Sequence, residues 1–167
     1  SFMSFMKTKY KNVGLNIFRI SFSGELSYEV AVPTKHALTF WNDCIKLGEK
    51  FGIQPYGTEA LHVMRAEKGF IMIGDETDGT VIPQDLNLNW AVSKKKKDFL
   101  GKRAHSRVYM AAEDRKQLVG LLTDNPAFVL PDGAHAIEKV EGRAGVNIIG
   151  HVTSSYFSPT LGRSIAL

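Results

Sequence analysis

Residues 15–32 read LNIFRISFSGELSYEVAV, and this stretch decides how the first part of the chain folds. Residues 15–22 alternate weakly between apolar and polar side chains, and residues 26–32 alternate cleanly, as strands with one buried face do. The intervening Ser23-Gly24-Glu25 is a turn signal. The stretch therefore predicts a β-hairpin with a three-residue loop.

Two helices are predicted after the hairpin. Pro33 and Thr34 mark the start of the first helix, with Thr34 as its N-cap, and Gly52 marks its end. The second helix starts within Pro55-Tyr56-Gly57-Thr58 and ends at Gly69. Strands followed by helices indicate an α+β arrangement for this part of the chain.

The pattern changes near residue 115, where we expect a boundary. Residues 94–116 are expected to form a linker or a charged surface helix. Beyond them, short strands separated by turns indicate an antiparallel barrel or sandwich. The expected strands are 117–123, 146–154 and 162–167, and the expected turns are 131–133 and 141–145.

Composition excludes several classes of protein. The 167 residues are 44% hydrophobic and 23% charged, which is typical of a globular protein and not of a disordered one. No apolar run approaches the ~20 residues of a membrane-spanning helix. The single cysteine, Cys44, permits no internal disulfide, and five scattered histidines give no metal-ligand spacing. We therefore expect a cytoplasmic protein with no metal site and no membrane contact.

Positive charge is concentrated in one segment. Residues 94–107 carry seven lysines and arginines against Asp98, so the rest of the chain is net negative although the total is +4. The segment could bind RNA phosphates, anionic lipid or a polyanionic ligand tail, or it could be a solvated boundary segment. Phe99 is its one aromatic residue, so the segment offers little aromatic surface on which nucleic-acid bases could stack. We favour the solvated boundary segment and expect no nucleic-acid partner.

Three charged residues stand out as candidates for a site. Glu29 lies in the second strand of the expected hairpin, where a solvated glutamate is the simplest reading. Glu67 falls on the apolar face of the second helix, where a structural tie to backbone amides is favoured. Arg65, at the edge of that face, is either a surface arginine or an anchor for a ligand anion or a ring edge.

Four motifs in matching order resemble the glycine-cleavage T-protein (aminomethyltransferase) family. They are Phe22–Val30, which is similar to the family's hairpin; Leu61–Gly69, its helix end; Gly74–Asp78 with Pro83, its following loop; and Ile149–Ser154 with Ser158–Leu161, part of its C-terminal barrel. The resemblance covers essentially the whole chain, and the sequence is most similar to the sarcosine-oxidase branch of the family. Ile73 and the Gly57-Thr58-Glu59-Ala60 run depart from the free aminomethyltransferases.

The resemblance implies an α+β fold in which part of a folate-binding domain precedes an antiparallel β-barrel. The implied ranges are 1–93 for the folate-binding region, 94–116 for a basic linker and 117–167 for a truncated barrel. The family's catalytic aspartate is expected to lie before residue 1, and further barrel strands are expected after Leu167. A fragment of this kind is expected to be inactive alone.

The resemblance also implies a function, which is transfer of the methylene group released by sarcosine demethylation to tetrahydrofolate. Glu29, Arg65 and Phe22 match the family's folate-binding positions, although Phe22 replaces a tyrosine there. Glu67 is expected to be a structural carboxylate. Flavin and NAD would be bound elsewhere in the parent enzyme, and the implied partners are the rest of the α subunit and the other sarcosine oxidase subunits.

Two other readings stay open on the sequence alone. The chain could be part of a dimethylglycine dehydrogenase or of a stand-alone aminomethyltransferase, which the flanking sequence would distinguish. It could also be a non-catalytic folate- or RNA-binding module that uses Lys94–Lys97, in which case RNA binding would be sensitive to salt.

Overall fold

A computed structural model describes residues 1–138 and 146–167, so the turn expected at 141–145 lies outside the described residues. The chain divides into two compact units, Ser1–Phe70 and Ile71–Leu167, which are described separately. In the part of the chain that the structure describes, no helix combines the length and the apolar character needed to cross a membrane.

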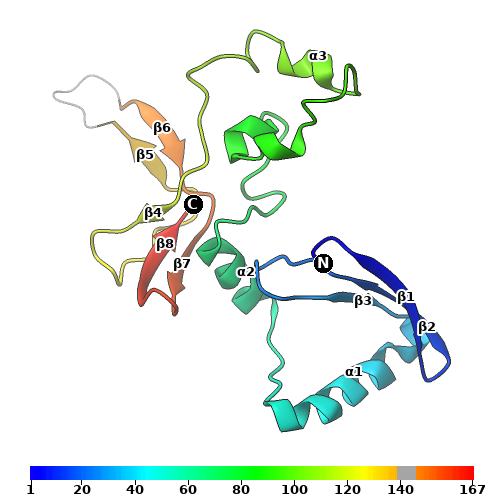
Figure 1. The fold of residues 1–167 in the computed structure, drawn as a ribbon. Coiled ribbons are helices and arrows are strands. Elements are labelled where there is room, and N and C mark those ends of the chain that lie inside the picture. The colour runs from blue at the N-terminus through cyan, green and yellow to red at the C-terminus, as the bar shows by residue number, and fades with distance from the viewer. Residues whose placement is uncertain (139–145) are drawn as a thin grey trace. The chain divides into compact units, whose positions relative to one another are not determined.

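The first unit holds three strands followed by helices, and the second holds short helices followed by strands (Figure 1). The first unit contains β1 (Phe5–Tyr10), β2 (Val13–Phe18), β3 (Glu29–Ala31), α1 (Thr34–Gly48), the 3-10 turn η1 (Glu49–Phe51) and α2 (Thr58–Glu67). The second unit contains η2 (Pro83–Leu86), η3 (Asn89–Ala91), α3 (Lys102–His105), β4 (Leu121–Leu122), β5 (His135–Ile137), β6 (Ile148–His151), β7 (Ser155–Ser158) and β8 (Arg163–Ala166).

The first unit is built on an antiparallel sheet in the order β1-β2-β3. Strand β1 was not expected from the sequence. It pairs with β2 through a two-residue turn in which Lys11 and Asn12 have φ of 47° and 65°. Positive φ at both positions is the geometry of a type I′ hairpin turn, whose twist matches that of the flanking strands.

The expected pairing of the two strands around Gly24 is confirmed, but the three-residue loop is wrong. Strand β2 ends at Phe18 and β3 begins at Glu29, so residues 19–28 form a longer connection. Arg19 organises this connection: its guanidinium lies 5.9 Å from the ring of Phe2 and 5.5 Å from that of Tyr28. Cation–π contacts and a hydrogen bond to the carbonyl of Ser27 (3.1 Å) replace the strand pairing that alternation alone predicted.

The two faces of this sheet differ. Tyr10 lies on the face that α1 contacts, because its hydroxyl donates to Asp43 at 2.7 Å and its ring packs edge-on against Phe40. The same face carries Leu15, which is 5% exposed. Side chains alternate between the faces of a strand, so Phe5, Lys7 and Lys9 of β1 lie on the opposite face.

Both helices of the first unit are where the sequence places them, with one correction. Thr34 is the first helical residue of α1, not its N-cap; Pro33 occupies the cap position and makes no side-chain capping bond. Helix α1 itself ends at Gly48, and η1 continues the helical stretch to Gly52, which ends it; Gly69 follows the end of α2, and both glycines have φ of 71°. This left-handed conformation stops a helix, and glycine adopts it without a Cβ clash.

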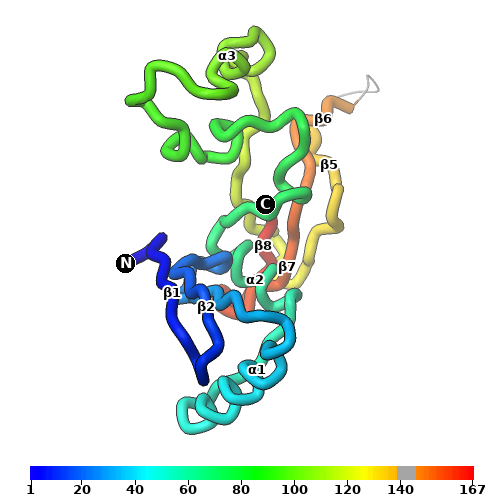
Figure 2. The backbone as a smooth tube through the Cα atoms, turned by 90° about the vertical axis from the view of Figure 1, so that its right-hand side faces the viewer, coloured from blue at the N-terminus to red at the C-terminus, as the bar shows by residue number. Residues whose placement is uncertain are grey.

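The described residues of the second unit form two antiparallel sheets, one in the order β4-β8-β7 and one of β5 and β6. Figure 2 follows the backbone through β5 to β8. The expected family fold is confirmed in its antiparallel character. Within residues 71–138 and 146–167, however, the strands do not close into a barrel. Strand β4 pairs with β8 over only two residues, and β6 pairs with β5 alone, so closure is not reached. The strands are shorter than expected, and β5 and β7 were not foreseen.

Candidate functional site

Glu29 is the first residue of β3, and its neighbours across the sheet define its surroundings. In the strand register Glu29 lies opposite Phe18, and Phe18 lies opposite Phe5. Directly opposed residues share a face, so Phe5, Phe18 and Glu29 form one row across the face opposite to that of Tyr10. Glu29 is exposed, and the rings of the two phenylalanines lie 5.0 Å apart. An accessible carboxylate therefore stands at the end of an aromatic row.

Phe22 lies in the connection before β3 and is 37% exposed. Two residues later, Gly24 has φ of 82°, and a Cβ placed there would lie 2.5 Å from the side chain of Lys68. The connection therefore passes close to the residue that follows α2. The structure thus brings the Phe22 loop and the end of the Arg65 helix together.

Arg65 and Glu67 occupy the last turn of α2. Arg65 is fully buried, and its Nη1 donates to the carbonyl of Phe70 at 3.2 Å, while its own carbonyl accepts from the Phe70 amide at 2.9 Å. Arg65 thus holds the backbone of Phe70, just after the helix, through both its side chain and its main chain. Glu67 is half-buried at the end of the helix.

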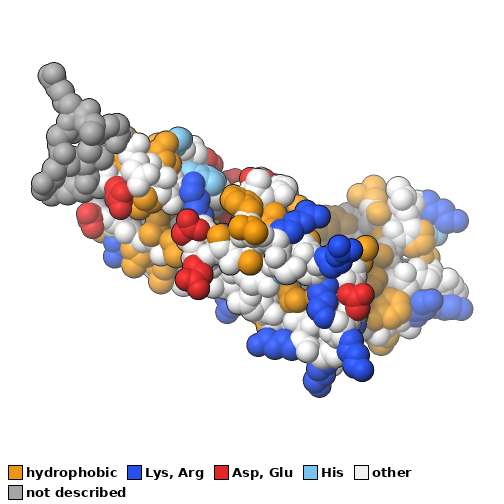
Figure 3. All heavy atoms as spheres, turned by 90° about the horizontal axis from the view of Figure 1, so that it is seen from above, with side chains coloured by type: hydrophobic (Ala, Val, Ile, Leu, Met, Phe, Trp, Pro, Cys, Tyr) orange, Lys and Arg blue, Asp and Glu red, His pale blue; other side chains and the backbone are white. Residues whose placement is uncertain are grey.

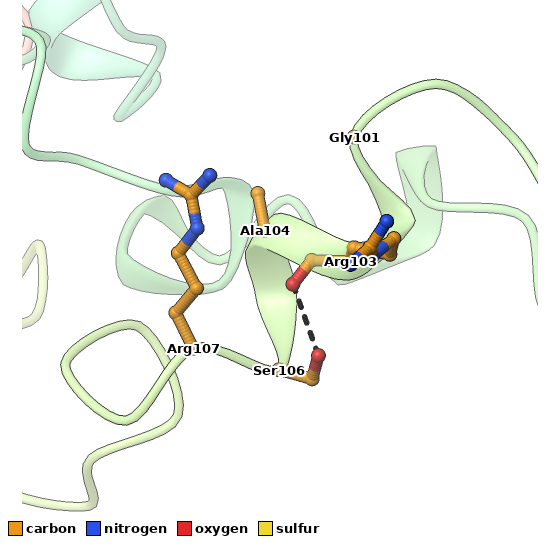
Figure 4. A pocket seen from close by; sticks show the side chains of 5 residues that line it. All are labelled: Gly101, Arg103, Ala104, Ser106 and Arg107. Carbon is orange, nitrogen blue, oxygen red and sulfur yellow. Dashed lines mark hydrogen bonds between the residues drawn. The ribbon is translucent and has the colours of Figure 1, made fainter.

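The basic segment of residues 94–107 is largely irregular, with only the four residues of α3 in a helix. Its lysines are exposed, and Lys and Arg side chains project from the face drawn in Figure 3. A shallow depression lies beside Arg103 and Arg107, where the Ser106 hydroxyl donates to the Arg103 carbonyl at 2.9 Å. In Figure 4 the two guanidinium groups point away from each other on either side of Ala104, so they do not converge on one anion.

In the second unit, Glu76 is a buried carboxylate that the sequence analysis did not single out. It is 5% exposed and accepts hydrogen bonds from the Met72 amide at 2.7 Å, the Thr153 hydroxyl at 2.9 Å and the Ser154 hydroxyl at 2.6 Å. These partners come from two segments about eighty residues apart. Glu76 therefore ties the loop after Phe70 to the segment before β7.

Asp85 and Arg115 form a second buried polar centre in this unit. Their side chains are 6% and 9% exposed, and the arginine Nε donates to Asp85 at 2.9 Å while its Nη2 contacts the second carboxylate oxygen. Arg115 also donates to the Thr80 carbonyl at 2.8 Å and lies 4.9 Å from the ring of Tyr109. The guanidinium holds the pKa of Asp85 below its ordinary value.

A cavity of about 660 Å³ in this unit is lined in part by Glu76, Asp85 and Arg115. Its volume is that of a small-molecule site. Its buried charged groups, however, already have partners: Asp85 and Arg115 bond to each other, and Glu76 accepts from the Met72 amide and two hydroxyls, which is the arrangement of a structural network. Across the described residues no group of three His, Cys, Asp or Glu side chains is arranged to hold a metal ion.

The aromatic row and the two buried polar centres escaped the sequence analysis for different reasons. Phe5 and Phe18 depended on strand β1, whose residues 5–10 show no clean alternation of apolar and polar side chains; Asn12 was the available turn signal. Glu76, Asp85 and Arg115 lie in polar stretches without periodicity. No local signal separates such buried charges from solvated ones, because their partners are distant in sequence.

Comparison with known families agrees with this architecture. Residues 1–96 match the GCVT N-terminal domain, and residues 116–167 match the glycine cleavage T-protein C-terminal barrel domain. The first match alone spans more than half of the chain. The chain belongs to the glycine cleavage T-protein family.

Within the family, the chain is similar to sarcosine oxidase subunit alpha and, more distantly, to aminomethyltransferases. It is 50% identical to the sarcosine oxidase subunit alpha of Corynebacterium sp. (strain P-1) and 42% identical to that of Rhizobium meliloti, covering 99% and 90% of this chain. It is 34% identical to the aminomethyltransferase of Chlorobium limicola over 96% of this chain. The chain spans 17% and 15% of the two oxidase subunits and 42% of the transferase. The relatives are thus enzymes or enzyme subunits.

Proposed function

We propose that this chain is the folate-binding, one-carbon-transfer region of a sarcosine oxidase α subunit. In this role it holds tetrahydrofolate while the methylene group released by sarcosine demethylation is transferred, giving 5,10-methylenetetrahydrofolate. The carrying observation is Glu29, an exposed carboxylate beside Phe18 on the face of the sheet opposite to that of Tyr10. The 50% identity to a sarcosine oxidase subunit alpha supports this branch over a free aminomethyltransferase.

The chemistry of Glu29 suits the edge of a pterin ring. That edge presents an N–H and an NH₂ side by side, and one carboxylate accepts from both at once. Glu29 is free to turn toward such a ligand, because it is exposed at the beginning of a short strand. A neutral amide offers only one acceptor oxygen there and directs its own NH₂ against the ligand's donors.

Phe22, Arg65 and Glu67 complete the proposed site in different ways. Phe22 would contact folate from the connection before β3. Arg65 would contribute from α2, where it fixes the Phe70 backbone, and Glu67 would be a structural carboxylate. In the proposed organisation, residues 1–93 bind folate, 94–116 link, and 117–167 contribute barrel strands. Flavin, NAD and the acid–base aspartate would belong to other parts of the enzyme.

Replacing Glu29 by glutamine is expected to weaken binding of a reduced folate by about 1–3 kcal/mol, since the donor pair on the pterin edge loses its charged acceptor. Isothermal titration of the intact protein with tetrahydrofolate under reducing conditions measures this loss. Glu25→Gln is the matched control, because Glu25 is also exposed but precedes β3. Equal affinities of Glu29→Gln and the unaltered protein would remove Glu29 from the site.

A further inference from the structure

We infer that the face of the β1-β2-β3 sheet opposite to that of Tyr10 is a built surface for the whole folate molecule. In this arrangement Phe18 stacks against the pterin, and Lys7 and Lys9 hold the carboxylates of the glutamate tail. The inference rests on the proposed function and extends it from one carboxylate to an ordered surface. Phe18 is then a folate-binding residue, and the two lysines determine how strongly the protein prefers a folate with a glutamate tail.

The position of Phe18 supports its assignment as the residue that stacks against the pterin. It lies directly opposite Glu29 in the strand register, so a flat ring whose edge meets Glu29 extends over the neighbouring strand. Phe18 is half-buried, and Phe5 supports it from the far side with ring centroids 5.0 Å apart and planes tilted by 37°. An aromatic side chain held at a fixed tilt beside an acceptor suits a planar heterocycle with donors on one edge.

The order of charges along β1 supports the assignment of Lys7 and Lys9 to the glutamate tail. Lys7 and Lys9 follow Phe5 on the same face and are both exposed. Alternate residues of a strand are about 6.8 Å apart, so the row of Glu29 and that of Lys9 are separated by about 14 Å along the strands. A reduced folate has the matching sequence of groups, which is donors at one end, rings in the middle and carboxylates at the other end. Glu29 stands at one end of this face, Lys9 at the other end and Lys7 between them.

An acidic side chain of the same chain could also pair with these lysines. Asp43, however, pairs with Lys11 and not with Lys7 or Lys9. The nearby cation Lys11 is the one paired with Asp43, at 2.7 Å, and it lies in the turn rather than on this face. Lys7 and Lys9 therefore remain available to an external anion. Because both are exposed, their attraction for carboxylates is screened by salt.

The test compares two probes on the intact protein, a reduced folate carrying several glutamates and a reduced pterin that lacks the benzoylglutamate tail. Phe18→Leu is expected to weaken both probes about 3- to 10-fold, and Phe18→Tyr is expected to retain binding because it keeps the ring. The double variant Lys7→Gln/Lys9→Gln is expected to weaken only the tailed probe, about 5-fold at low salt and less at high salt.

Matched variants separate these effects from general damage. Phe51→Leu removes an exposed ring elsewhere in the same unit, and Lys35→Gln/Lys50→Gln removes two exposed lysines of α1 and η1. Both control variants are expected to bind both probes as the unaltered protein does. An unchanged midpoint of thermal unfolding shows that Phe18→Leu has folded. If Phe18→Leu does not fold, the affinity of Phe18→Tyr for the two probes is compared with that of the unaltered protein instead.

The outcomes distinguish this inference from the proposed function. If Glu29→Gln weakens both probes while the Phe18 and lysine variants bind normally, the inference is overturned and the proposed function stands. If the lysine double variant weakens the tailless pterin equally, the lysines act through the fold and not through the tail. If the unaltered protein binds neither probe, the proposed function itself is wrong, and if it binds both while every variant binds as tightly, this face of the sheet is not the folate surface and the inference is overturned.

Discussion

Replacing Asp85 by alanine is expected to lower the free energy of unfolding of the Ile71–Leu167 unit by about 3–5 kcal/mol, because it leaves a buried guanidinium without its carboxylate. Arg115 is 9% exposed at its side chain and also donates to the Thr80 and Tyr109 carbonyls, so it cannot turn out to water without breaking those bonds. The backbone of Asp85 itself accepts from the Leu118 amide at 2.7 Å. The pair therefore fastens residues 80–85 to residues 109–118.

Urea unfolding followed by circular dichroism measures the loss. Asp124→Ala removes an exposed aspartate from the same unit and is expected to change stability by less than about 0.5 kcal/mol. Replacing both partners, as in Asp85→Leu/Arg115→Met, is expected to cost less than the sum of the single losses, because no unpaired charge is left. Additive losses would show that the two side chains are not coupled.

The same pair predicts how stability depends on pH. The hydrogen bond from Arg115 lowers the pKa of Asp85 below its ordinary 3.8, against the opposing effect of burial. A carboxyl group whose folded pKa is lowered adds stability above its unfolded pKa and loses it as the pH falls through the folded value. The contribution of Asp85 is therefore complete above about pH 5 and declines below about pH 4. In Asp85→Asn this part of the acid dependence is expected to disappear.

Replacing Glu76 by alanine is the second large effect, with an expected loss of about 3–5 kcal/mol. A buried donor that loses its acceptor costs about 1–3 kcal/mol, and Glu76 accepts from the Met72 amide and from the Thr153 and Ser154 hydroxyls. Glu76→Gln keeps one acceptor oxygen, and the hydroxyls can rotate to accept from its amide. A smaller loss of about 1–2 kcal/mol is therefore expected for glutamine.

Thermal unfolding gives the size of the loss, and hydrogen exchange of the Met72 amide gives its location. That amide donates directly to Glu76 at 2.7 Å, so its protection is expected to fall in Glu76→Ala more than that of the Leu118 amide, which donates to the Asp85 carbonyl. Glu113→Ala, at an exposed glutamate, serves as the control. Unaltered exchange at Met72 would show that Glu76 does not hold this loop.

Local sequence patterns predicted the elements whose causes are local. The alternation around Tyr28 and Val30 predicted a strand, and Gly52 and Gly69 predicted helix ends, since each depends on neighbours along the chain. The patterns failed where another interaction competed with local preference. Arg19 draws residues 19–28 out of the hairpin through two aromatic rings and a backbone carbonyl, so the strands are shorter than alternation implies.

The candidate site divides in the same way. The motif around Glu29 could be recognised from the sequence, because a family hairpin is a continuous run of residues. The row of Phe5, Phe18 and Glu29 could not, since it depends on the register of three strands, and a shift of one residue moves a side chain to the other face.

The sequence by itself determined the family, the α+β character and the position of Glu29, because continuous motifs and periodicity carry that information. Only the tertiary structure decided that Arg65 is buried against the Phe70 carbonyl and that Glu76 and Asp85 are bound by distant donors. The physical reason is that a charged residue looks the same in sequence whether water or a buried partner solvates it. Its role is fixed by partners that folding brings from elsewhere in the chain.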